Sequence, residues 1–130
     1  MIDPNALSKP GNVDIEDETH LALLQEWAQV AKSGGSKILM QINHPGKQVV
    51  KMLNPEAIAP SVVALGQPHA SIFSTHRTFT NTEICNIIER FATTAAVTQK
   101  AGFDGVQLHD AHGYLISQLL SPHHNRRSDE

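Results

Sequence analysis

A helical pattern followed by a short apolar strand occurs twice in this chain, and this order most constrains its fold. Residues 37–43 (KILMQIN) follow an amphipathic segment at 18–32, and residues 105–109 (GVQLH) follow a second one at 81–100. Strands that alternate with helices are typical of βαβ units, in which the strands form a parallel sheet. The sequence therefore predicts an α/β fold.

The first helix is expected over 18–32, with Asp17 as its N-cap and Glu18 in its first turn, where an acidic side chain suits the helix dipole. Gly34 and Gly35 follow the pattern and are expected to end the helix. Apolar residues at i, i+3 and i+4 spacing predict the buried face. These residues are Leu21, Leu24, Trp27, Val30 and Ala31.

The second helix has clearer signals at both ends. Thr80 and Glu83 form the T-x-x-E pattern of a capping box, and Gly102 stands where a glycine commonly follows a helix. A helix is therefore expected over 81–100, and a short third helix over 115–120. The stripe expected to be buried on the second helix is Ile84, Ile87, Ile88, Phe91, Ala95 and Thr98.

Residues 44–79 separate the first predicted strand from the second helix. Prolines and glycines interrupt this stretch and no clear periodicity runs through it, so a long βα loop is expected. Loops of this length in compact domains are usually functional or disordered. Residues 1–16 are also expected to be irregular.

The composition excludes several classes of function. The chain has 130 residues and a formal net charge of −3, which provides no basic surface for nucleic acid or anionic lipid. Cys85 is the only cysteine, so a disulfide framework and a cysteine-rich zinc module are excluded. The start does not have the pattern of a signal peptide, and no apolar run is long enough to span a membrane. These features predict a soluble cytoplasmic protein without a nucleic-acid or membrane partner.

Polar side chains lie on one face near the end of both predicted strands. Alternation places Gln41 on the face of Leu39 and Asn43, and it places His109 on the face of Gln107. In a (β/α)8 barrel the aliphatic face of each strand packs on the outer helices, and the polar face looks inward at the active-site end. Gln41 and His109 are therefore expected at the mouth of one pocket, on neighbouring strands.

The stretch HDAHGY after the second strand has several interpretations. His109 and His112 have a workable spacing for metal ligands, with His123 and His124 nearby, but no H-E-x-x-H pattern or cysteine pair completes a zinc site. A serine or cysteine nucleophile is set aside, because no G-x-S-x-G motif is present and the single cysteine lies within the second helix.

Two further interpretations of this stretch stay open. In one, His109, His112 and Tyr114 are ordinary structural residues of a strand end and a turn. In the other, the two imidazoles donate to one carbonyl oxygen and stabilise its developing negative charge, while the phenol donates a proton to a nearby carbanion. The position at the carboxyl end of a barrel-type strand favours the second interpretation.

Two segments resemble a known family. Residues 102–130 (GFDGVQLHDAHGYLISQLLSPHHNRRSDE) closely resemble the strand-four segment of the NADH:flavin oxidoreductases, the old yellow enzyme family. Residues 37–48 (KILMQINHPGKQ) are similar to the strand-three segment, which ends Q-[LI]-x-H-x-GRQ in that family. Residues 3–35 and the APS at 59–61 are also similar, so the resemblance covers nearly the whole chain.

The resemblance implies a partial (β/α)8 TIM barrel, with about two parallel strands and flanking helices, and an FMN-dependent enzyme. In that family NADH or NADPH reduces the flavin, which then passes a hydride to the β-carbon of an activated alkene. His109 and His112 would bind the carbonyl or nitro oxygen of this small-molecule substrate. Tyr114 would protonate the α-carbon, and Gln41 would hydrogen-bond the pyrimidine edge of the flavin.

The chain departs from the family pattern at three positions outside this catalytic set. Lys47 stands where the family usually has Arg, and a lysine lacks the planar fork of a guanidinium. Leu119 replaces the usual Phe, and His76 stands where Pro is expected.

By the resemblance, residues 1–130 are an incomplete segment of one FMN-binding barrel domain, because such a barrel has about 250 residues. Two parallel strands would leave unpaired edges and half-covered aliphatic faces, so self-association or pairing with the missing barrel part is expected. Two functions follow as hypotheses. The first is an ene-reductase-type oxidoreductase, and the second is a catalytically inactive fragment or interaction remnant that cannot hold FMN alone.

Overall fold

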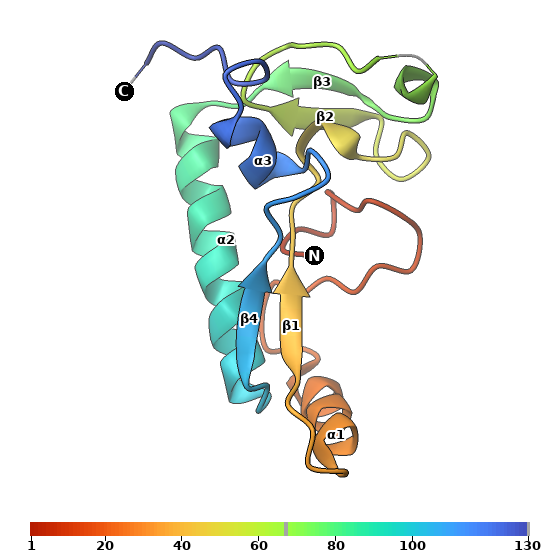
Figure 1. The fold of residues 1–130 in the computed structure, drawn as a ribbon, viewed down its shortest axis with the longest axis vertical. Coiled ribbons are helices and arrows are strands. Elements are labelled where there is room, and N and C mark those ends of the chain that lie inside the picture. The colour runs from red at the N-terminus through yellow and green to blue at the C-terminus, as the bar shows by residue number, and fades with distance from the viewer. Residues whose placement is uncertain (67, 130) are drawn as a thin grey trace.

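The computed structural model describes residues 1–66 and 68–129. Within these residues the chain forms two small parallel sheets, three α-helices and two 3-10 turns (Figure 1). In chain order the elements are α1 (Leu21–Lys32), β1 (Leu39–Ile42), η1 (Gly46–Gln48), β2 (Glu56–Ala59), η2 (His69–Ser71), β3 (Thr75–Thr78), α2 (Asn81–Lys100), β4 (Gly105–Leu108) and α3 (Leu115–Leu120).

The predicted parallel pair is formed by β1 and β4, with Gln41 opposite Gln107 in the register. Helix α2 precedes β4 in the chain, and its C-terminal half lies beside β4 (Figure 1). Asp104 fixes the start of both strands, because its carboxylate accepts from the backbone N–H of Ile38 at 3.0 Å and from Nζ of Lys37 at 2.9 Å. The α/β fold with two parallel strands and flanking helices is confirmed.

The stretch 44–79 joins β1 to α2 as expected, but it is more regular than its sequence indicates. It contains the second sheet, in which β2 pairs in parallel with β3 above the carboxyl ends of β1 and β4 (Figure 1). The lack of periodicity is explained by length, because each of these strands has only 4 residues. Two repeats of an alternating apolar and polar pattern are too few to distinguish a strand from a loop.

The bounds predicted for the second and third helices are confirmed. Helix α2 starts with the capping box, since the Thr80 side chain accepts from the N–H of Glu83 and the Glu83 carboxylate accepts from the N–H of Thr80. It ends before Gly102, whose φ of 88° lies in the left-handed region that favours glycine. Helix α3 spans the predicted residues Leu115–Leu120.

The predicted start of the first helix was wrong. Helix α1 begins at Leu21, its N-cap residue is His20, and no side chain caps it. Asp17 instead accepts from the backbone N–H of Thr19 at 2.8 Å, which closes a separate turn before the helix. Glu18 therefore lies outside the first helical turn, where its carboxylate pairs with Lys100 of α2.

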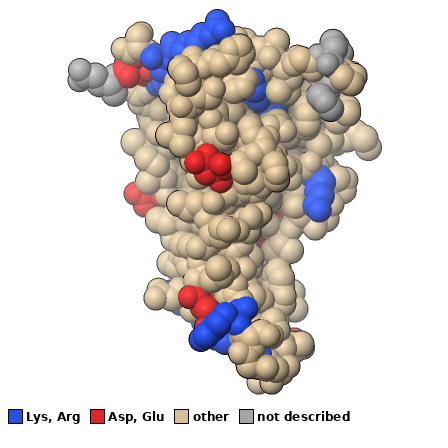
Figure 2. Space-filling view, in the orientation of Figure 1, with Lys and Arg blue, Asp and Glu red and all other residues tan. Residues whose placement is uncertain are grey.

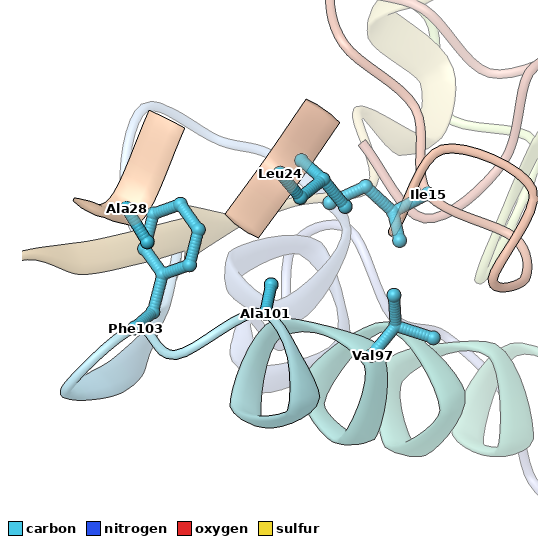
Figure 3. Packing of buried hydrophobic residues seen from close by; sticks show 6 residues of the cluster. All are labelled: Ile15, Leu24, Ala28, Val97, Ala101 and Phe103. Atoms are coloured by element: carbon cyan, nitrogen blue, oxygen red, sulfur yellow. The ribbon is translucent and has the colours of Figure 1, made fainter. Parts of the chain in front are cut away.

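The first of two main cores lies between α1 and the end of α2 (Figure 3). Its buried members are Ile15, Leu24, Ala28, Val97, Ala101 and Phe103. The predicted stripe of α1 is only partly correct. Leu24 is buried, but Val30 is 66% exposed and Trp27 is 45% exposed, and Trp27 touches Phe103 through an edge-to-face ring contact.

The second core lies between α2, α3 and the carboxyl end of β1. Its buried members are Ile2, Ile42, Phe79, Ile87 and Leu115. Met40 contacts both cores, so β1 joins them. The predicted stripe of α2 holds for Ile87 but fails at Ile88, which is 60% exposed. The irregular lead-in packs against the sheet through Ile2, whose N–H donates to the carbonyl of Asn43.

Aliphatic side chains remain uncovered next to the second core. Leu108 of β4 is 56% exposed and Val106 is 37% exposed. A groove lined by Ile88, Phe91, Leu108 and other apolar residues follows the junction of α2, β4 and α3. Most of the surface over β1 and β4 carries neither acidic nor basic residues (Figure 2).

Within the described residues, no helix is both long enough and apolar enough for a membrane span.

Candidate active site

The loop after β4 brings three predicted site residues together. The ring centroids of His109 and His112 are 5.1 Å apart, and the ring of Tyr114 lies 4.9 Å from His109 and 6.1 Å from His112. All three pairs meet edge to face. His109 and Tyr114 are half-buried, whereas His112 is exposed. The two imidazoles and the phenol therefore form one cluster that a small molecule can reach.

The backbone around His109 fixes both its place and its tautomer. Its N–H donates to the carbonyl of Ile42 at 3.0 Å, which extends the pairing of β4 with β1 by one residue. Its ring Nδ1 accepts from the N–H of Ala111 at 3.3 Å. In a neutral imidazole the other nitrogen then carries the hydrogen, so Nε2–H of His109 is the group available to donate.

Gln41 lies on β1, on the face that sequence alternation assigned to it. Its Nε2 donates to Oε1 of Gln107 at 2.8 Å across the β1–β4 pair. Both side chains are exposed. Gln107 lies on β4 two residues before His109, whose N–H extends the pairing with β1, so Gln41 belongs to the same face and end of the pair as the ring cluster, although it does not touch the rings.

Two buried or half-buried glutamines that were not predicted as site residues support the ring cluster. Gln48 donates from Nε2 to the carbonyls of His112 at 2.8 Å and Gly113 at 2.7 Å. Gln118, which is 0% exposed, donates to the carbonyls of Gly113 at 2.6 Å and Pro45 at 3.1 Å. Gln118 is the one amide in the otherwise apolar end of α3, and this contrast is a signal that sequence reading could have used.

The loop after β1 leaves two buried polar atoms without a hydrogen-bond partner in the described residues, Oδ1 of Asn43 and Nε2 of His44. Nδ1 of His44 accepts from the N–H of Gly46 at 3.0 Å. Burial lowers the pKa of His44 to about 4, because the charged ring would lose its hydration. His44 is therefore neutral at physiological pH.

The histidines of the C-terminal segment do not join the ring cluster. His123 and His124 contact each other, and Nδ1 of His124 lies 3.0 Å from Nζ of Lys47. Over residues 1–66 and 68–129, no group of three or more His, Cys, Asp or Glu side chains could hold a metal ion. The geometry thus offers the His109–His112 pair no third metal ligand within the described chain.

The family model for NADH:flavin oxidoreductase / NADH oxidase matches residues 1–130. The chain belongs to this family. A NADH-dependent flavin oxidoreductase of Aspergillus parasiticus is 40% identical over the whole chain, which covers 31% of that protein. A NADPH dehydrogenase of Clostridium acetobutylicum is 38% identical over 99% of the chain, which covers 37% of that protein.

The fold is that of the corresponding part of an old yellow enzyme. Morphinone reductase, a TIM barrel solved in complex with tetrahydroNAD, superposes with a TM-score of 0.88 and 25% sequence identity. The alignment covers 98% of this chain and 39% of that one. The chain thus spans less than two fifths of the length of these relatives. Gln41 lies on the barrel-type strand β1, and the ring cluster directly follows the barrel-type strand β4.

Proposed function

We propose that the protein acts as part of an FMN-dependent NAD(P)H oxidoreductase of the ene-reductase type. The single observation that carries this proposal is the convergence of His109, His112 and Tyr114, with ring centroids 4.9 to 6.1 Å apart. Family membership adds that the relatives are named as flavin oxidoreductases and NADPH dehydrogenases. We further infer that residues 1–130 are one segment of a single FMN-binding barrel domain.

His109 and His112 are proposed to bind the carbonyl or nitro oxygen of an activated alkene. Nε2–H of His109 is free of the internal hydrogen bond that Nδ1 makes with Ala111, so it can donate to that oxygen. A second donor from the exposed ring of His112 would share the same oxygen. Two aligned donors stabilise the negative charge that develops there in the transition state.

Tyr114 is proposed as the general acid that protonates the α-carbon. Its ring meets both imidazoles edge to face, at centroid distances of 4.9 Å from His109 and 6.1 Å from His112. A neutral phenol at this position can hand over its proton after charge has moved toward the substrate oxygen.

Gln41 is proposed to hydrogen-bond the pyrimidine edge of the flavin. Its exposed carboxamide offers a donor and an acceptor in one plane, as the pyrimidine edge of FMN requires, and Gln107 holds it in place at 2.8 Å. Bound FMN, reduced by NADH or NADPH, would supply the hydride to the β-carbon of the alkene. Gln41 itself would orient the ring system above the strand ends.

One observation favours the second candidate, a fragment without activity of its own. Leu108 and Ile88 are exposed along an apolar groove, as expected for a surface that pairs with further barrel strands or with a second chain. The two candidates differ in whether this chain holds FMN. Self-association through the groove is proposed in either case.

The test is to purify the chain with FMN and measure the visible flavin absorbance retained after gel filtration. Retained flavin that bleaches with NADH or NADPH and recovers with an enone supports the oxidoreductase. In that preparation, loss of one donor in His109→Ala or His112→Ala should lower turnover about 10²–10³-fold. Tyr114→Phe should lower turnover about 10²–10⁴-fold. No retained flavin would favour the inactive fragment.

A further inference from the structure

His112 has a backbone conformation that is uncommon for a residue other than glycine. Its φ is 57°, and it is the only residue other than glycine with a positive φ among those described. Side chains with a Cβ are disfavoured in this left-handed region, so another interaction must hold the residue there. Such strain commonly occurs at functional sites, where the surrounding structure maintains it.

The carboxamide of Gln48 provides that interaction. Because His112 and Gly113 are both left-handed, with φ of 57° and 68°, their carbonyls accept from one nitrogen, Nε2 of Gln48, at 2.8 and 2.7 Å. Both hydrogens of that nitrogen are used. Gln48 belongs to the 3-10 turn after β1, between the buried residues Lys47 and Val49, so its backbone is itself held by packing.

Gln118, from helix α3, also hydrogen-bonds the backbone of this turn. It donates to the carbonyl of Gly113 at 2.6 Å while its Oε1 accepts from the N–H of Lys47 at 3.2 Å. The loop after β1 and the loop after β4 are therefore joined by two carboxamides. Only that of Gln48 reaches the carbonyl of His112 itself.

We propose that Gln48 is a positioning residue that holds His112 in the left-handed conformation and thereby keeps its ring against His109. This inference rests on the proposed role of the two imidazoles as paired donors. Without the Gln48 amide, His112 relaxes to a negative φ, and its ring leaves the position 5.1 Å from that of His109. Gln48 touches no reacting atom and acts through the backbone of His112.

The test measures the ring contact directly, by NMR, in the wild-type chain and in four variants. Wild type should show a nuclear Overhauser contact between the rings of His109 and His112. Gln48→Met removes the donor at similar size and should abolish the contact. Gln48→Lys retains a donor that reaches both carbonyls and should restore it. Gln48→Asn, one methylene shorter, should weaken it, and Gln99→Met, an exposed glutamine of α2, is the matched control.

A structural role alone would lower stability without moving the two rings apart. The proposal is overturned if wild type lacks the contact, if Gln48→Met folds and keeps it, or if Gln48→Lys loses it as completely as Gln48→Met. If Gln48→Met does not fold, an unchanged contact in Gln48→Asn overturns it. Because the contact is measured without turnover, failure of the proposed function appears separately, as unchanged enone reduction in His109→Ala and His112→Ala.

Discussion

The ammonium nitrogen of Lys47 lies 3.0 Å from Nδ1 of His124, and the Lys47 side chain is only 2% exposed. Nζ also donates to the carbonyl of Val63 at 2.9 Å, and Nε2 of His76 lies 3.1 Å from the same oxygen. Burial lowers the pKa of Lys47. The pKa values of His124 and His76 are lowered first by burial and then by the charge of Lys47.

Replacement of Lys47 by methionine should raise the pKa of both His124 and His76, because it removes a neighbouring positive charge at nearly the same side-chain volume. The measurement is a titration of the histidine ring hydrogens by NMR in wild type and in Lys47→Met. Lys51→Met, which removes an exposed charge from the same loop, is the control. Unchanged pKa values in Lys47→Met would show that the ammonium group does not act on these rings.

A second prediction concerns the loss of stability in acid through His44. Its pKa is about 4 in the folded chain, against about 6.5 in the unfolded chain, so the unfolded chain takes up the proton first. Stability contributed by the neutral ring is fully present above pH 6.5 and falls until about pH 4. The shift corresponds to roughly 3 kcal/mol of unfolding free energy.

Urea unfolding at intervals between pH 7 and pH 4 measures this loss. His44→Gln, which keeps an acceptor near the N–H of Gly46, should show a smaller fall in unfolding free energy over that range. His20→Gln, at an exposed histidine, serves as the control. If the unfolding free energy of His44→Gln fell as steeply as that of wild type over this range, His44 would not be the cause of the loss.

Local sequence signals predicted the elements whose ends are set by neighbouring residues. The capping box at Thr80 and the glycine at Gly102 define α2, because both act within a few residues of the chain. The same reasoning failed at Asp17, since a side chain that can cap a helix can equally close a turn before it. The sheet of β2 and β3 was missed because each of its strands has only 4 residues, which is too short for an alternating pattern to stand out in the sequence.

The ring cluster could be predicted from the motif, but the contact that Gln48 makes with it could not. His109, His112 and Tyr114 lie within six residues, so any tight turn brings them close. Gln118 lies 5 residues from Gly113, on the helix that follows this turn, so its contact is local. Gln48 lies 65 residues from Gly113 and reaches the turn only after the loop behind β1 has folded against it. The contact of Gln48 therefore depends on tertiary packing, which periodicity and motif spacing do not describe.

Gly46 should not tolerate a side chain. Its φ is 58°, and a Cβ added there would lie 2.7 Å from Cδ and 2.6 Å from Nε2 of Gln118. Gln118 cannot move away cheaply, because it is fully buried and hydrogen-bonded at both ends of its amide. Gly46→Ala should therefore lower the unfolding free energy by roughly 2–4 kcal/mol, from left-handed strain and overpacking together.

The matched control for Gly46→Ala is Gly34→Ala, where an added Cβ meets nothing within 4 Å and φ is not positive. Its effect on unfolding free energy should stay within about 0.5 kcal/mol. Equal effects of the two substitutions in urea unfolding would contradict the close approach of Gly46 to Gln118.

The start of α2 gives the last prediction. Thr80 accepts from the N–H of Glu83 at 3.2 Å, and the Glu83 carboxylate accepts from the N–H of Thr80 at 2.8 Å while it pairs with Arg77. Thr80→Ala removes one half of this box and should lower the unfolding free energy by about 1 kcal/mol.

The control is Thr93→Ala, in the exposed middle of the same helix. It should raise the unfolding free energy by a few tenths of a kcal/mol, because alanine is the better helix former. Thermal unfolding of the two variants side by side distinguishes them, and a Thr80→Ala chain as stable as Thr93→Ala would mean that Arg77 and Glu83 hold the helix start without the threonine.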